Sequence, residues 1–155
     1  MAESLIISDG NKNVKYSVLY SQIRSIIDSE SDLISNMANV SSMIHHTFGF
    51  WWTGFYIVKA GQLVLGPFQG PVACTRIGLG KGVCGTSWER KETVIVPDVD
   101  LFPGHIACSS LSRSEIVVPI FRNGEVYAVL DIDSKELSTF DEVDKEWLEK
   151  IAGLI

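Results

Sequence analysis

The stretch SEIVVPIFRNGEVYAVLDID, residues 114–133, constrains the fold of this 155-residue chain more than any other segment. It contains two runs rich in β-branched and aromatic residues, separated by the dipeptide Asn123-Gly124. That dipeptide is typical of a type I′ turn, which joins two antiparallel strands. We therefore expect a hairpin here, and the fold of the whole chain must contain an antiparallel sheet that includes it.

The segments on either side predict helices near both ends of the chain and short strands between them. Apolar residues recur at helical spacing in the first two segments, and turn residues separate the β-rich runs. Thr139 and Glu142 have the spacing of a capping box at the start of the last helix. Helices are expected in 14–29, 32–48, 80–91 and 138–155, strands in 51–68 on both sides of 59–61, in 70–77 and in 92–99 as far as Pro97, and an irregular connection over 100–113.

This order of elements predicts an α+β fold. Helices come first, consecutive strands follow, and a helix closes the chain, which favours an antiparallel sheet with segregated helices over a parallel βαβ design. Hydrophobic residues make up 46% of the chain and charged residues 21%, a globular composition without a break that would mark a linker. We expect a single domain over residues 1–155.

The charge balance and the N-terminus limit the possible partners. The formal net charge is −6, so the electrostatic attraction that supports nucleic-acid binding is missing. The N-terminal residues lack the basic and long apolar regions of a secretion signal, and no apolar run of about 18 residues suggests a membrane span. We expect a cytoplasmic protein that binds neither nucleic acid nor membranes.

Three cysteines are the residues whose chemistry most needs an explanation. Cys74, Cys84 and Cys108 lie 10 and 24 positions apart, which differs from the close pairing of structural zinc ligands, so no metal is expected there. An odd number of cysteines in a reducing compartment also disfavours a structural disulfide framework. Cys74 and Cys84 fit ordinary buried positions, whereas Cys108 lies among small and polar residues in an expected loop. His105 lies three residues before Cys108, so a hydrolase with a cysteine-histidine pair is an alternative interpretation of these residues.

Two further groups of residues have both a structural and a functional interpretation. Asp131 and Asp133 share one face of the second hairpin strand, with Glu115 on the first strand. They form either a solvated edge or a site for an ammonium group or a proton donor. Trp52 and Tyr56 share a strand face as well, and they serve either simple packing or one wall of a ligand pocket.

Several motifs carry a resemblance to a known family. The segments GFYIV, LGPFQGPVACTRIGLGKGVCGTSW, VPDVDLFPGHIACSSLSRSEIVVPI and AVLDIDS resemble the free methionine-(R)-sulfoxide reductases, single-domain members of the GAF family, from about Tyr16 to the C-terminus. The cysteine positions discriminate, because sensory GAF domains share the fold without them. The resemblance implies a six-stranded antiparallel sheet between helices.

The resemblance also implies a role for each cysteine. It makes Cys108 the nucleophile, Cys74 the thiol that resolves the resulting sulfenic acid in a disulfide, and Cys84 a second recycling or exchange thiol. Thioredoxin would restore the dithiol, so no bound cofactor is expected. Members of the family are commonly homodimers.

The same resemblance implies a closed pocket for free L-methionine-(R)-sulfoxide. Its acidic residues would be Glu115, Asp131 and Asp133, and its aromatic wall would be Trp52 and Tyr56. A neutral carboxyl group could protonate the leaving oxygen, with Glu115 and Asp133 as candidates beside Asp131. The remaining carboxylates could bind the substrate ammonium, and the aromatic rings could contact its S-methyl group.

Two other functions remain open from the sequence. A GAF domain without catalytic activity could bind a small ligand and signal to a partner, although such modules usually belong to longer multidomain chains. A thiol redox sensor would form a disulfide without releasing methionine. Turnover of a sulfoxide substrate distinguishes both from the reductase.

Overall fold

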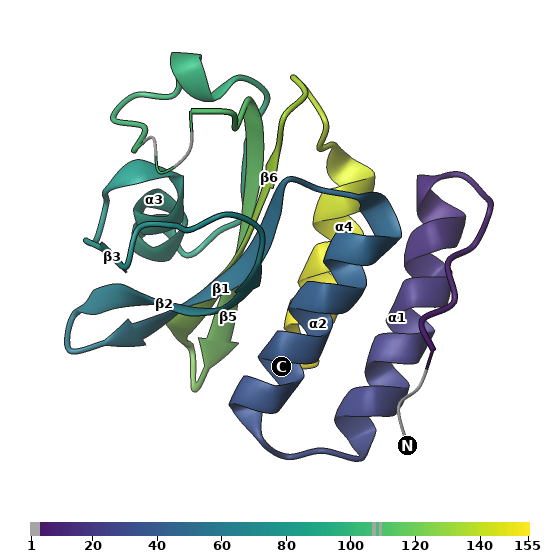
Figure 1. The fold of residues 1–155 in the computed structure, drawn as a ribbon. Helices are drawn as coiled ribbons and strands as arrows, with labels where there is room; N and C mark the ends of the chain where they lie inside the picture. The colour runs from purple at the N-terminus through teal and green to yellow at the C-terminus, as the bar shows by residue number, and fades with distance from the viewer. Residues whose placement is uncertain (1–3, 107, 109) are drawn as a thin grey trace.

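The computed structural model describes residues 4–106, 108 and 110–155, so residues 107 and 109 of the expected connection lie outside the described part. Six strands form one sheet in the order β3-β2-β1-β6-β5-β4, and all neighbours are antiparallel (Figure 1). The predicted α+β class is confirmed. The elements are α1 (Lys12–Asp28), α2 (Leu33–Phe48), β1 (Trp52–Lys59), β2 (Gln62–Gln69), β3 (Arg76–Ile77), α3 (Gly82–Arg90), β4 (Val94–Val96), a 3-10 helix η1 (Val99–Leu101), β5 (Ser114–Arg122), β6 (Glu125–Ser134) and α4 (Glu142–Ala152).

The central hairpin forms as the sequence predicts. Asn123 and Gly124 both have positive φ, 51° and 78°, as the two central residues of a type I′ turn require. The turn fixes a register in which Arg122 pairs with Glu125 at one end of the hairpin. At the other end Ser114 pairs with Ser134, so β5 and β6 pair along their whole length.

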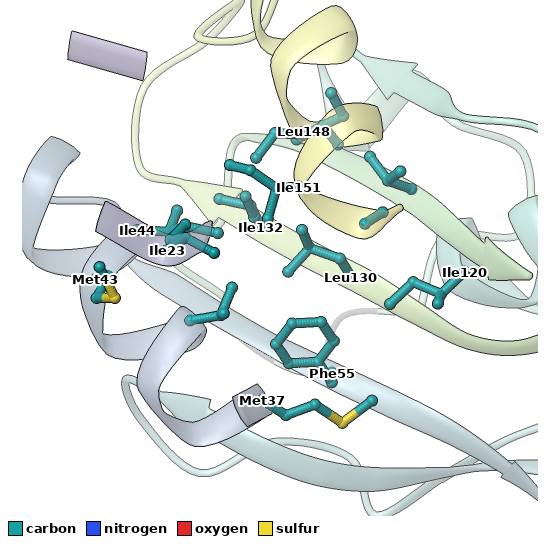
Figure 2. Close-up of a cluster of buried hydrophobic side chains, with 14 of the residues drawn as sticks. Ile23, Met37, Met43, Ile44, Phe55, Ile120, Leu130, Ile132, Leu148 and Ile151 are labelled. Atoms are coloured by element: carbon teal, nitrogen blue, oxygen red, sulfur yellow. The ribbon is translucent and has the colours of Figure 1, made fainter. Parts of the chain in front are cut away.

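The two faces of the sheet are covered differently. Helices α1, α2 and α4 lie on one side and α3 on the other (Figure 1). The side with three helices holds the larger apolar core, which Figure 2 shows between the helices and the strands. Its fully buried side chains include Ile23, Ile44, Phe55, Leu130 and Leu148. None of the described helices is both long and apolar enough to cross a membrane.

The start of α4 differs from the prediction. The capping box is formed by Asp141 and Asp144 and not by Thr139 and Glu142. The Asp141 backbone N–H donates to Asp144 Oδ2 at 2.9 Å, and the Asp141 side chain accepts from the Asp144 N–H. Thr139 instead donates its hydroxyl to Ser134 Oγ at 2.6 Å, which ties the segment before the helix to the end of β6.

The strand predicted in 70–77 is also shorter than expected. Only Arg76 and Ile77 pair with β2, and Cys74 lies in the loop before them. The backbone carbonyl of Cys74 accepts a hydrogen bond from the Tyr56 hydroxyl at 2.9 Å, so a side chain takes the place of a ladder partner. The loop therefore carries Cys74 over the α3 side of the sheet.

Candidate active site

A pocket lies on the face of the sheet that carries α3. Strands β1, β5 and β6 form its floor, and α3 and the loops that contain Val72 and Cys108 form its walls. Seven of the eight candidate residues line it, and the eighth, Cys74, is bonded to Cys108. The lining consists of Trp51, Trp52, Tyr56, Val72, Ala73, Ile77, Lys81, Gly82, Val83, Cys84, His105, Ile106, Cys108, Ser112, Glu115, Asp131 and Asp133.

Cys74 and Cys108 form a disulfide beside the pocket, 34 positions apart in the sequence and with their Cα atoms 5.5 Å apart. This is the pairing that the family resemblance implies. The alternative of Cys74 as an ordinary buried residue is therefore wrong. Cys108 is exposed, as its polar sequence context indicates, and Cys74 is half-buried. The bond joins the loop after β2 to the loop before β5.

Cys84 is the free thiol of the site. It lies near the start of α3, is 3% exposed, and points toward the carboxyl groups on β5 and β6. Burial raises the pKa of Cys84 well above its usual range, and the charges of Asp131, Glu115 and Asp133 raise it further. The thiol is therefore protonated at neutral pH as long as no cation enters beside it.

The three carboxyl groups lie on one face of the β5–β6 hairpin. Glu115 on β5 pairs directly with Asp133 on β6, and Asp131 follows two residues earlier on the same face of β6. Glu115 is 5% and Asp131 6% exposed, so the alternative of a solvated edge is wrong. Ser112 donates its hydroxyl to Asp133 Oδ1 at 2.7 Å.

The proximity of these groups controls their protonation. Burial raises the pKa of Glu115 well above its usual range, and Asp131 and Asp133 raise it further. Burial and Asp131 likewise raise the pKa of Asp133, while the hydrogen bond from Ser112 opposes this. Burial also raises the pKa of Asp131, but hydrogen bonds from Glu115 and Cys84 oppose the rise. Asp131 is therefore the hydrogen-bond acceptor of the cluster, and Glu115 keeps the proton that it donates in this hydrogen bond.

An aromatic wall closes one side of the pocket. The rings of Trp52 and Tyr56 stack with their centroids 5.9 Å apart, and the Phe68 ring also stacks on Trp52, with a centroid distance of 5.2 Å. Gly54 permits this arrangement, because a Cβ atom there would lie 2.6 Å from Trp52 Cη2. The indole N–H donates to the Pro71 carbonyl at 3.0 Å. The shared face predicted for Trp52 and Tyr56 thus becomes part of a pocket.

Some site residues were not predicted, or were predicted for another purpose. His105 places Nε2 3.8 Å from Glu115 Oε2, and Cys108 is bonded to Cys74, so the arrangement does not support a cysteine-histidine hydrolase. Burial lowers the pKa of His105 although Asp100 opposes this, which favours a neutral imidazole. Ser112 was missed, because nothing in a loop with several serines distinguishes the one that reaches Asp133.

The fold and the position of this pocket define a class of protein. A sheet with helices on one face and a pocket under loops on the other is the arrangement of a GAF domain, and the family model described as GAF domain matches residues 30–155. The GAF domain-containing protein A of Dictyostelium discoideum is 52% identical over 156 residues, covering 100% of this chain and 99% of that protein.

Two further relatives narrow the assignment. The free methionine-R-sulfoxide reductase of Saccharomyces cerevisiae is 46% identical, with 96% of this chain and 87% of that protein covered. The crystal structure of the free methionine-R-sulfoxide reductase from Neisseria meningitidis, in complex with its substrate, superposes with a TM-score of 0.97 at 48% identity, over 99% of this chain and 93% of that one. The chain belongs to the free methionine-R-sulfoxide reductases of the GAF domain family.

Proposed function

We propose that this protein reduces free L-methionine-(R)-sulfoxide to L-methionine, with Cys108 as the nucleophile and Cys74 as the resolving thiol. The observation that carries the proposal is the Cys74–Cys108 disulfide beside a pocket with three clustered carboxyl groups. Such a disulfide is the expected product of one turnover. Relatives named for this activity, at 46% and 38% identity, support the same assignment.

The proposed reaction balances in two steps. The Cys108 thiolate attacks the sulfoxide sulfur, and the sulfoxide oxygen accepts a proton and is transferred to Cys108. Methionine is released, and Cys108 is left as a sulfenic acid. The Cys74 thiol then attacks the sulfenic sulfur, which forms the disulfide and releases water. The sulfoxide gains two electrons and the two cysteines lose them.

Glu115 and Asp133 are the proposed proton donors for the sulfoxide oxygen. A general acid must carry its proton at the working pH, and burial raises the pKa of both carboxyl groups toward that condition. Glu115 is the better candidate, because Asp131 accepts a hydrogen bond from it and thereby retains the proton on Glu115.

Substrate binding divides between charge and aromatic contact. Asp131 and Asp133 are proposed to bind the substrate ammonium group, since Asp131 Oδ1 is buried and has no hydrogen-bond partner among the described residues. The stacked rings of Trp52 and Tyr56 offer an apolar face for the S-methyl group. An N-acetylated substrate lacks the ammonium charge, so we expect a selectivity for the free amino acid.

Regeneration of the dithiol needs an external reductant. We propose thioredoxin, which would attack the exposed disulfide by thiol exchange, with Cys84 as a second thiol able to exchange with it. Such recycling fits a reducing cytoplasm. A homodimer and a single domain over residues 1–155 are further parts of the proposal; the homodimer rests on the family resemblance, and the single domain on chain length and composition.

The test follows NADPH oxidation with thioredoxin, thioredoxin reductase and free methionine-(R)-sulfoxide. The S epimer, an N-acetylated R substrate and Cys108→Ser are the controls. Turnover with the free R epimer alone, abolished in Cys108→Ser, is the expected result. Absence of turnover with folded, reduced protein that still binds the sulfoxide would contradict the proposal and favour a ligand-sensing GAF domain.

A further inference from the structure

Three buried side chains from three different elements converge at the floor of the pocket. Cys84 on α3, Glu115 on β5 and Asp131 on β6 each direct one potential ligand atom, Sγ or a carboxylate oxygen, to within 4.8 Å of the other two. None of the three is more than 6% exposed. Convergence of sulfur and oxygen donors at this depth is the arrangement that a bound cation would need.

A second observation also points to a ligand site here. Asp131 Oδ1 is buried and accepts no hydrogen bond from any described residue, although Asp131 lines the pocket. A buried carboxylate oxygen without a donor costs considerable free energy, and such atoms are normally satisfied by a donor or a cation. The orphan oxygen lies on the same residue that takes part in the converging set.

We propose that Cys84, Glu115 and Asp131 form a binding site for a zinc-like divalent cation. Thiolate and carboxylate groups are both ordinary ligands of Zn²⁺. Ligand atoms in a tetrahedral zinc site lie about 3.3 to 3.6 Å apart. Side-chain rotations that move the three ligand atoms by roughly 1 Å would bring them to this spacing around an ion. Binding releases the Cys84 proton, and the proton of Glu115, to solvent.

The donor set also selects among cations. Hard ions such as Mg²⁺ and Ca²⁺ prefer oxygen ligands only, so a thiolate at the centre disfavours them. His105 provides a candidate fourth ligand, with Nε2 3.8 Å from Glu115 Oε2. The site uses one cysteine alone and therefore differs from the three-cysteine site that the sequence spacing excludes.

The redox state of the chain does not prevent binding. Cys84 stays a free thiol while Cys74 and Cys108 are bonded to each other, so the oxidised form can bind the ion. One consequence rests on the proposed function. Because the substrate ammonium would share Asp131 with the ion, Zn²⁺ should inhibit reduction in competition with the sulfoxide.

The experiment measures metal binding directly on the oxidised protein, without turnover. Zn²⁺ is titrated against a chromophoric chelator, and Co²⁺ is added separately to detect thiolate-to-metal charge-transfer absorption. We expect one ion per chain, and we expect Cys84→Ser to remove the Co²⁺ charge-transfer band and to weaken Zn²⁺ by more than about 100-fold, since loss of outer-shell partners alone costs about 10- to 100-fold. Glu125→Gln, an exposed carboxylate on β6, is the matched control and should bind as wild type.

Asp131→Asn provides a second, nearly isosteric variant in case Cys84→Ser does not fold, as judged by circular dichroism. It should also weaken Zn²⁺. Absence of stoichiometric binding by the oxidised wild type overturns the proposal, and so does equal affinity in a folded Cys84→Ser or Asp131→Asn variant. Neither result bears on sulfoxide reduction, so the two proposals fail separately.

Discussion

The Tyr56 hydroxyl donates a hydrogen bond to the backbone carbonyl of Cys74 at 2.9 Å, which links the aromatic wall of the pocket to one half of the disulfide. Burial raises the pKa of Tyr56, so the hydroxyl remains a donor across the physiological range. Cys74 lies in a loop without strand pairing. This hydrogen bond therefore helps to fix the position of Cys74.

Tyr56→Phe should slow disulfide closure and leave the pocket largely intact. The phenyl ring still stacks on Trp52, while loss of the hydrogen bond costs about 1 kcal/mol and lets the loop move. Rapid quenching after addition of one equivalent of sulfoxide, with thiol counting, measures the closure rate. Tyr127→Phe, whose ring lies 4.2 Å from the guanidinium carbon of Arg122, is the control. A closure rate equal to wild type in Tyr56→Phe would contradict this role.

The buried Glu115 predicts a particular pH dependence of stability. The pKa of Glu115 is raised in the folded state, whereas the pKa of an unfolded glutamate is about 4.3. Between these two pKa values the native state holds a proton that the unfolded state loses. Stability therefore falls as pH rises from the unfolded pKa through the folded pKa, by at most about 1.4 kcal/mol per pH unit. Glu115→Gln lacks this loss.

Urea unfolding of wild type and Glu115→Gln at about pH 5 and about pH 8, with a chelator present, measures the difference. The variant should gain stability relative to wild type at the higher pH. Glu125→Gln makes the same substitution at an exposed position and should follow the pH profile of wild type. Parallel pH profiles for wild type and Glu115→Gln would show that Glu115 is ionised in the folded protein.

A buried carboxylate far from the pocket ties α1 to α4. Asp144 is 1% exposed, and it accepts hydrogen bonds from the Tyr16 hydroxyl and from Lys12 Nζ, both at 2.6 Å. Tyr16→Phe leaves one carboxylate oxygen without its donor, which should lower the free energy of unfolding by about 1.5 to 3 kcal/mol. Tyr20→Phe, whose ring packs on Trp147, is the matched control and should cost less.

The start of α4 offers a direct comparison of the two capping assignments. Asp141→Ala should lower the free energy of unfolding by about 1 kcal/mol, because the Asp141 side chain caps the helix. Glu142→Ala should lower the free energy of unfolding by only a few tenths of a kcal/mol, since Glu142 is not part of the capping box. Equal losses in urea unfolding, or a larger one for Glu142→Ala, would restore the capping box read from the sequence.

The hairpin and most helices were predictable from local patterns, whereas the pocket was expected only from the family resemblance. Asn123-Gly124 determines the turn and the register, and alternation along β6 puts Asp131 and Asp133 on one face. The disulfide between Cys74 and Cys108 was expected from the family motifs alone, because spacing could not rank the possible pairs.

Other features depend on contacts that the sequence does not display. The capping box of α4 uses Asp141 and Asp144, and Thr139, which the sequence pattern assigned to the box, instead bonds to Ser134. The convergence of Cys84 with Glu115 and Asp131 depends on how α3 crosses the sheet. Sequence patterns describe each element by itself, so they do not predict how a helix packs against two strands.

The most direct test of the account is a single turnover without any recycling system. Fully reduced protein is mixed with one equivalent of free methionine-(R)-sulfoxide, then methionine is quantified and the remaining thiols are mapped by alkylation and mass spectrometry. The account predicts one methionine per chain and a fall from three free thiols to one, with Cys84 alkylated and Cys74 bonded to Cys108. Methionine release with Cys108 still alkylatable, or equal release by Cys108→Ser, would contradict it.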